Sequence, residues 1–309
     1  VCCLSSLNLE KYDEWKDDAM MINDVMRFLD NVLTDFIERA PDQFADAKYS
    51  AARERSVGLG VMGFHSYLQK HSIPLESVMS KVWNKKIFKH IQEHVDQASK
   101  DLADERGPCP DAAEYGFNER FSNKTAIAPT ASISIICGGA SPGVEPVAAN
   151  SYTHKTLSGS FNVRNRYLVE LLEKHGKNNE DVWSGITTNQ GSVSDLDFLT
   201  DHEKDVFKTA FELDQKWIIE LSGDRTPHIS QAQSINLFLA ADVHKKELHK
   251  IHFDAWKKGL KSLYYCRSKS IQRAENVNDE KSTDILANVY KQKPTAAKDP
   301  EYEECLSCQ

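Results

Sequence analysis

Two cysteines near the C-terminus have the spacing of a redox-active pair. Cys305 and Cys308 form a C-x-x-C motif, whose thiols can close a disulfide with each other. No second cysteine pair lies close by to complete a four-cysteine zinc site. The segment before them has the composition of a flexible chain, and a chain of this length has a typical reach of roughly 30–37 Å. The sequence therefore predicts a carrier dithiol that can visit a buried site and return to solvent.

Two further cysteines lie at the other end of the chain. Cys2 and Cys3 directly precede the largely apolar segment at residues 4–9. Taken alone, such cysteines are most often buried and structural. Thiol–disulfide exchange needs a partner sulfur, so the carrier dithiol favours an active-site thiol at Cys2 or Cys3. The other cysteines, for which the pattern indicates no redox role, are Cys109, Cys137 and Cys266.

A loop of small residues could bind an anion. It comprises Pro129, Thr130, Ala131, Ser132 and Ile133, between a predicted strand and a short element. Small side chains let amide N–H groups and hydroxyls approach a phosphate closely. An ordinary β-turn with a capping serine explains the same composition equally well, so both interpretations stay open.

Two adjacent tyrosines, Tyr264 and Tyr265, end the last predicted strand. Neighbours on a strand point to opposite faces, so the pattern predicts one tyrosine in the core and one outside. Phenols can also be oxidised and so pass on electrons and protons.

Two other motifs favour structural interpretations. Residues 58–63 match G-x-G-x-x-G, but the charged residues 51–56 before them do not form a buried strand, as a dinucleotide site requires. We expect a glycine-rich helix packed against a neighbour. His90 and His94 match H-x-x-E-H on a helix rich in lysine and glutamate. That helix face is predicted to be solvated, and no metal site is expected.

The elements that must position these residues follow from the spacing of apolar side chains. Thr200 and Glu203 form a capping box before one helix, and Asp242 can cap another. Strands separated by such helices predict an α/β domain with largely parallel pairing over residues 1–267, followed by a flexible tail at 268–309. The predicted helices cover residues 17–39, 82–102, 163–175, 201–221 and 243–258; the predicted strands cover 234–239 and 260–267; and residues 125–146 form a strand, a loop, a short element and a loop.

Composition excludes several classes of protein. The 309 residues include 38 basic and 46 acidic side chains, for a net charge of -8, which disfavours nucleic-acid binding. Aromatic residues make up 9%, too many for a wholly disordered chain. No apolar run approaches the ~20 residues needed to cross a bilayer, so no membrane association is expected. Seven cysteines, an odd number, fit a reducing compartment and a cytoplasmic location.

Six segments, spread over the whole chain, form a pattern. They are residues 1–9 (VCCLSSLNL), 55–63 (RSVGLGVMG), 128–132 (APTAS) with 143–146 (GVEP), 233–237 (QSINL), 259–265 (GLKSLYY) and the terminal cysteine pair. In this order they resemble the large, catalytic subunit of class I ribonucleotide reductase. The resemblance implies a ten-stranded α/β barrel of two five-stranded halves, of which this chain would be the second. Because the sequence starts at Val1 inside the active-site strand, we expect one half of a split or processed subunit, active only with an N-terminal partner chain.

The same resemblance implies roles for the residues described above. Cys2 looks like one of two active-site thiols, since Cys3 stands where the family usually has another residue type. The loop at 129–133 looks like the cradle for the substrate phosphates. Tyr264 and Tyr265 resemble the stacked pair that relays a radical from the metal-containing small subunit. Cys305 and Cys308 look like the tail dithiol, which thioredoxin or glutaredoxin reduces.

The reaction implied is the reduction of ribonucleoside diphosphates to deoxyribonucleotides for DNA synthesis. A radical abstracts the 3′ hydrogen, the 2′ hydroxyl leaves as water, and the thiol pair supplies two electrons. No cofactor would bind to this chain itself. Three alternatives are a non-catalytic assembly module of the same fold, a fragment of a cobalamin-dependent reductase, which the tyrosine pair disfavours, and a stand-alone thiol oxidoreductase.

Overall fold

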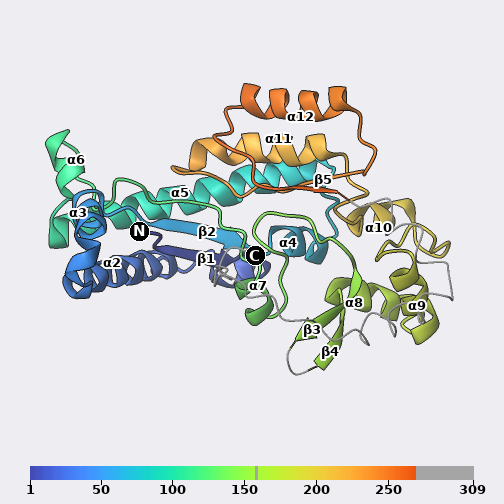
Figure 1. Ribbon diagram of the computed structural model, residues 1–309. Helices are drawn as coiled ribbons and strands as arrows, with labels where there is room; N and C mark the ends of the chain where they lie inside the picture. The colour runs from blue at the N-terminus through green and yellow to red at the C-terminus, as the bar shows by residue number, and fades with distance from the viewer. Residues whose placement is uncertain (157–158, 269–309) are drawn as a thin grey trace, which may run out of the picture.

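The computed structural model describes residues 1–156 and 159–268, which form a mixed α/β structure (Figure 1). The first half contains β1 (Leu4–Asn8), the 3₁₀ helix η1 (Leu9–Lys11), α1 (Tyr12–Trp15), α2 (Met21–Arg39), η2 (Asp42–Phe44), α3 (Ala45–Glu54), β2 (Gly58–Met62), α4 (Phe64–Lys70), α5 (Val78–Arg106), α6 (Pro110–Glu114) and α7 (Ile133–Ile136). The second half contains β3 (Ser151–Thr156), β4 (Gly159–Arg164), α8 (Arg166–Lys174), α9 (Glu180–Thr188), α10 (Asp201–Val206), α11 (Gln215–Arg225), η3 (Thr226–His228), β5 (Leu237–Leu239), α12 (Lys245–Lys257) and β6 (Cys266–Ser268).

Parallel strands and single parallel bridges lie side by side at the centre of the structure. β1 pairs with β2, from Leu4 opposite Gly58 to Asn8 opposite Met62. Single parallel bridges continue the order from Leu59 to Thr125 and from Ile127 to Gln233, and β5 pairs with β6. Five chain segments thus follow one another side by side, which confirms the predicted α/β class with largely parallel pairing.

The glycine-rich segment is a strand and not a helix, so that prediction was wrong. Residues 58–62 form β2, which is buried throughout. A Cβ atom at Gly60 would lie 2.2 Å from the carbonyl oxygen of Ala126, so only glycine lets the neighbouring segment approach this closely. The preceding charged residues lie in α3, as expected for a segment that is not a buried strand.

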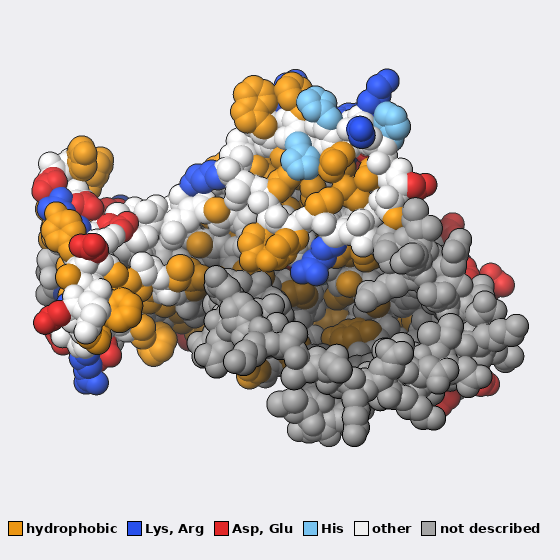
Figure 2. All heavy atoms as spheres, in the orientation of Figure 1, with side chains coloured by type: hydrophobic (Ala, Val, Ile, Leu, Met, Phe, Trp, Pro, Cys, Tyr) orange, Lys and Arg blue, Asp and Glu red, His pale blue; other side chains and the backbone are white. Residues whose placement is uncertain are grey.

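Helices cover this central layer. The apolar spacing in α2 buries Ile22, Met26, Leu29 and Leu33, and these side chains share one core with β1, β2 and α5. In Figure 1, α11 lies along α5 and α12 lies outside α11. Phe253 and Trp256 of α12 are exposed, and Figure 2 shows apolar and histidine side chains gathered over this helix.

A second core forms around α8, α9 and α10. Leu168, Leu172, Trp183 and Ile186 are buried together there, beside the antiparallel hairpin of β3 and β4 (Figure 1). This hairpin was missed by the sequence analysis. The predicted helix at 163–175 begins only at Arg166, because Val163 and Arg164 belong to β4 and the Asn165 side chain caps α8.

Other predicted boundaries also needed correction. The helix predicted at 201–221 is two helices, α10 and α11, because Asp214 caps a new helix start. The capping box of Thr200 and Glu203 is confirmed. The strands predicted at 234–239 and 260–267 shrink to the three residues of β5 and of β6. His244, rather than Asp242, caps α12.

No helix within residues 1–156 and 159–268 combines the length and the apolar character needed to cross a membrane.

Candidate functional site

The two N-terminal cysteines have opposite environments. Cys2 is exposed, whereas Cys3 is buried and its thiol donates a hydrogen bond to the Leu29 carbonyl oxygen at 3.5 Å. Burial, together with the nearby Asp30 carboxylate, raises the pKa of the Cys3 thiol. A thiol that stays protonated is a poor nucleophile. Of the two residues that the sequence left open, Cys2 is therefore the one whose thiol solvent and ligands can reach.

The predicted phosphate loop is held by a hydrogen bond between a side chain of the loop and the backbone of a later segment. Thr130 is buried and has a left-handed backbone with φ of +56°. Its Oγ1 atom accepts a hydrogen bond from the Gly143 N–H at 2.7 Å, so the hydroxyl of Thr130 fixes the loop. Ala131, Ser132 and Ile133 are exposed, and Pro129 is partly buried. The loop thus presents small, exposed residues on a fixed backbone.

The tyrosine pair lies immediately before β6. The ring centroids of Tyr264 and Tyr265 are 4.2 Å apart with an interplanar angle of 58°. The two residues are 39% and 46% exposed, so the expectation of one core and one surface tyrosine was wrong. The reason lies in the backbone: this stretch is not a regular strand, since the Tyr265 N–H donates to the side chain of Asn236.

A buried carboxyl group is linked to the tyrosine pair through one asparagine, and the sequence gave it no role. Glu145 is 8% exposed and accepts a hydrogen bond from Asn236 Nδ2 at 2.6 Å. Burial raises the pKa of Glu145 to about 7, although the Asn236 hydrogen bond and the charge of Arg267 oppose this. Asn236 thus connects Glu145 to the backbone of Tyr265. The sequence signal that could have indicated this role is the acidic residue of the segment 143–146 (GVEP), which belongs to the pattern described above.

Replacing Glu145 by glutamine should change how stability depends on pH. The pKa of Glu145 rises on folding from 4.5 to about 7, so its contribution is fully present below pH 4.5 and is lost as pH rises through 7. Relative to Glu145→Gln, we expect the parent chain to lose up to about 3 kcal/mol of unfolding free energy over this window. Urea unfolding at a series of pH values measures the difference. The exposed Glu93→Gln is the control, and parallel curves for parent and Glu145→Gln would contradict the prediction.

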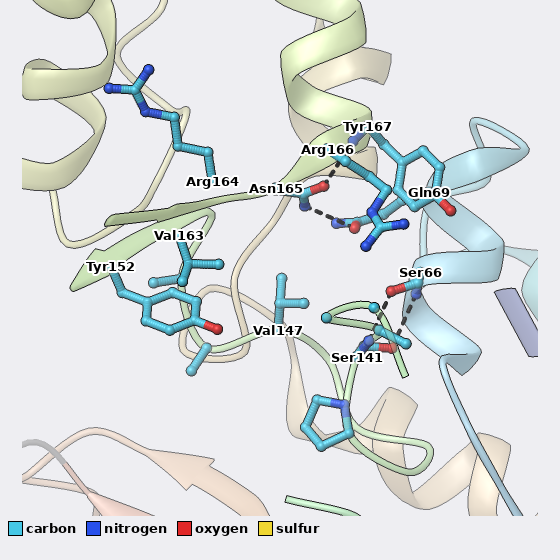
Figure 3. Close-up of a pocket in the computed structure, with 16 residues that line it drawn as sticks. Ser66, Gln69, Ser141, Val147, Tyr152, Val163, Arg164, Asn165, Arg166 and Tyr167 are labelled. Carbon is cyan, nitrogen blue, oxygen red and sulfur yellow. Dashed lines mark hydrogen bonds between the residues drawn. The ribbon is translucent and has the colours of Figure 1, made fainter. Parts of the chain in front are cut away.

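A cavity of about 490 Å³ lies between α4, β4, the start of α8 and the segment that follows α7 (Figure 3). Ser66 and Ser141 exchange backbone-to-hydroxyl hydrogen bonds of 3.1 and 2.8 Å. Asn165 Nδ2 donates to the Gln69 side chain at 2.9 Å, and Arg166 pairs with Glu10 at 2.9 Å. The serine pair thus fixes the segment after α7 to α4, and the other two contacts fix the start of α8 to α4 and to η1. Of the predicted site residues that the structure describes, none lines this cavity.

The histidine motif takes part in packing. His90 and His94 are both partly buried rather than fully solvated, and the Tyr12 hydroxyl lies 3.0 Å from His90 Nδ1. In the part of the chain that the structure describes, no three histidine, cysteine or acidic side chains are grouped so that they could hold a metal ion. Cys305 and Cys308 lie outside the described residues.

Comparison with known proteins adds a family relationship. The family model described as the ribonucleotide reductase barrel domain matches residues 1–120 and 111–266. The chain is 51% identical to the ribonucleoside-diphosphate reductase large subunit of Invertebrate iridescent virus 6 over 282 residues, which cover 90% of the chain and 29% of the relative. The corresponding subunit of Invertebrate iridescent virus 3 is 45% identical over 92% of the chain and 45% of its own length.

A solved structure gives the same result. The Actinobacillus ureae class Id ribonucleotide reductase alpha subunit superposes with a TM-score of 0.81 at 38% identity, over 89% of this chain and 51% of the solved chain. The chain therefore spans about half or less of the length of these relatives.

Proposed function

Because this chain belongs to the ribonucleotide reductase family and matches its barrel domain, we propose that it supplies the C-terminal part of the catalytic barrel of a ribonucleoside-diphosphate reductase large subunit. The observation that carries the proposal is the exposed Cys2 thiol, two residues before β1 and beside the buried Cys3. In this proposal Cys2 is one of the two thiols that reduce the ribose and end as a disulfide. The other thiol and the radical-bearing cysteine come from the part of a large subunit that this chain does not span.

The remaining roles follow from the same resemblance. The loop at 129–133 binds the diphosphate of the substrate through exposed small residues, on a backbone that the Thr130 hydroxyl holds in place. Tyr264 and Tyr265 pass the radical towards the active site, for which their ring separation of 4.2 Å is suitable. The radical itself comes from a metal-containing small subunit, and no cofactor is assigned to this chain.

Cys305 and Cys308 complete the cycle in this proposal. Their thiols attack the active-site disulfide that includes Cys2, so that the active-site dithiol is regenerated and the tail pair becomes oxidised. Thioredoxin or glutaredoxin then reduces the tail disulfide. This exchange needs a reducing compartment, and we propose the cytoplasm, which suits the five free cysteines among the described residues.

The experiment is reconstitution of the chain with a chain holding the rest of a large subunit, with a small subunit and with a reductant. We expect thioredoxin-dependent reduction of ribonucleoside diphosphates. Replacing Cys305 and Cys308 together by serine should abolish the thioredoxin-dependent reaction, while a small dithiol such as dithiothreitol, which reaches the active site directly, restores turnover. The control is replacement of Cys109, a buried cysteine for which no redox role is proposed.

Two results would contradict the proposal. If the complex forms but thioredoxin-dependent turnover is unchanged without the tail thiols, the chain acts as an assembly module. If the isolated chain reduces disulfide substrates unaided, it is a thiol oxidoreductase of another kind.

A further inference from the structure

Helices α1 and α5 bring a buried tyrosine and a histidine into hydrogen-bond contact. The Tyr12 hydroxyl lies 3.0 Å from His90 Nδ1, and Tyr12 is only 2% exposed. Burial, assisted by the neighbouring His94, lowers the pKa of His90, so the imidazole is neutral near pH 7. A neutral ring has one nitrogen that accepts. We assign the tautomer in which His90 Nδ1 accepts, so that the Tyr12 hydroxyl donates to it.

Packing on all sides fixes this pair. The Trp15 ring stacks on His90 at 6.3 Å and meets the Tyr12 ring edge-on at 5.0 Å. The His94 ring lies 4.3 Å from that of His90, and its Nδ1–H donates to the His90 carbonyl oxygen. Among the charged groups around the pair, Glu93 and Asp17 raise the pKa of His90, and Lys86 lowers it.

A second buried tyrosine provides the contrast. The ring centroid of Tyr67 lies 5.8 Å from that of Tyr12, but among the described residues the Tyr67 hydroxyl has no hydrogen-bond partner. Burial raises the pKa of both phenols, that of Tyr12 to about 12. A phenol that loses an electron becomes strongly acidic and must release its proton. Tyr12 has a base within proton-transfer distance, whereas Tyr67 has none in the described structure.

We propose that Tyr12 and His90 form a redox-active pair that gives one electron to a strong one-electron oxidant, such as a protein thiyl radical. The electron leaves the phenol for the oxidant, and a thiyl radical thereby becomes a thiolate. The Tyr12 O–H bond breaks, and its proton forms an N–H bond at His90 Nδ1. The products are a neutral phenoxyl radical and an imidazolium, and the reverse transfer restores both side chains.

The position of the pair suggests its use. The Trp15 indole N–H donates to the carbonyl oxygen of Asn8 at 3.0 Å, and Asn8 ends the strand that Cys2 precedes. On the other side, Tyr67 contacts the partly buried Trp83 at 5.5 Å. The aromatic cluster can thus take up an oxidising equivalent that strays from the reacting thiols. This use rests on the proposed function for the source of the oxidant, whereas the chemistry of the pair does not.

Photochemical oxidation of the full chain tests the pair without any nucleotide chemistry. A ruthenium polypyridyl sensitiser with a sacrificial electron acceptor is the oxidant, and electron paramagnetic resonance detects tyrosyl radicals. We expect a long-lived, buried neutral radical that is lost in Tyr12→Phe and kept in Tyr67→Phe. His90→Asn should also lose it, because an amide oxygen can accept the hydrogen bond but cannot take the proton.

The outcomes separate clearly. A long-lived radical that persists in Tyr12→Phe or in His90→Asn overturns the proposal. Should a variant fail to fold, the parent chain decides alone: its radical must show a hydrogen bond to the phenoxyl oxygen that exchanges in deuterium oxide, and absence of this coupling overturns the proposal. The photochemical test does not depend on ribonucleotide reduction. A failure of the proposed function and a failure of the Tyr12–His90 pair can therefore be told apart.

Discussion

Replacing Cys2 by serine should abolish ribonucleotide reduction in the reconstituted enzyme. A hydroxyl cannot form the disulfide that carries two electrons away from the substrate, so turnover should fall by more than about a hundredfold. Because Cys2 is exposed, the unfolding free energy should change by less than about 0.5 kcal/mol. Steady-state turnover with thioredoxin and urea unfolding of the same preparation measure the two effects.

Cys3→Ser is the matched control for this prediction. The buried Cys3 thiol donates a hydrogen bond to the Leu29 carbonyl oxygen. Because a C–O bond is shorter than a C–S bond, a serine hydroxyl would meet this oxygen less well, and we expect a loss of about 1–3 kcal/mol of stability. The folded fraction should keep its turnover. If Cys3→Ser abolishes turnover while Cys2→Ser keeps it, the assignment of the active-site thiol is reversed.

Replacing Asp30 by asparagine should strongly destabilise the chain. Asp30 is fully buried, and its carboxylate pairs with Arg55 at 2.6 Å, with Arg106 at 2.8 Å and with Arg120 at 2.9 Å. The asparagine keeps the size but removes the carboxylate that the three guanidinium groups share, although Arg106 also pairs with Glu105 at 3.3 Å. Removing one partner from a buried ion pair costs about 3–5 kcal/mol, and we expect a loss in this range in urea unfolding.

The same helix supplies the control. Asp35 of α2 pairs with Arg39 at 2.9 Å, but both side chains are mostly exposed, so Asp35→Asn should have little effect. Burial opposes ionisation of Asp30, yet hydrogen bonds from the three arginines lower its pKa. Its stabilising contribution is therefore present above the unfolded-state pKa and is lost as pH falls. If the Asp30 and Asp35 variants lose the same unfolding free energy, the buried ion pairs of Asp30 stabilise the chain no more than an exposed pair does, and the prediction is wrong.

Periodic segments were predictable because their signal is local. The apolar spacing of α2 and the capping box at Thr200 depend on residues three or four positions apart. β2 was missed because its glycines carry no strand preference of their own. They are required by Ala126, whose carbonyl oxygen passes beside Gly60. The β3–β4 hairpin lies in a segment without a strong alternating pattern, and it was missed for the same lack of local signal.

The candidate site was predictable only as a set of separate motifs. The chemistry of thiols and phenols suggested the two N-terminal cysteines and the tyrosine pair. Only the family resemblance favoured Cys2 over Cys3, and the difference in burial between the two depends on the fold. Glu145 and Asn236 are 91 positions apart, and neither residue type alone indicates their contact. Long-range polar pairs of this kind depend on the complete fold.

The separate core around α8, α9 and α10 makes this part of the described chain a cooperative unit of its own. Its buried residues do not belong to the core that holds β1, β2, α2 and α5. Units with separate cores can open independently of one another. The walls that α8 and β4 contribute to the cavity in Figure 3 can therefore loosen by subglobal unfolding, while the strand that follows Cys2 stays in register with β2.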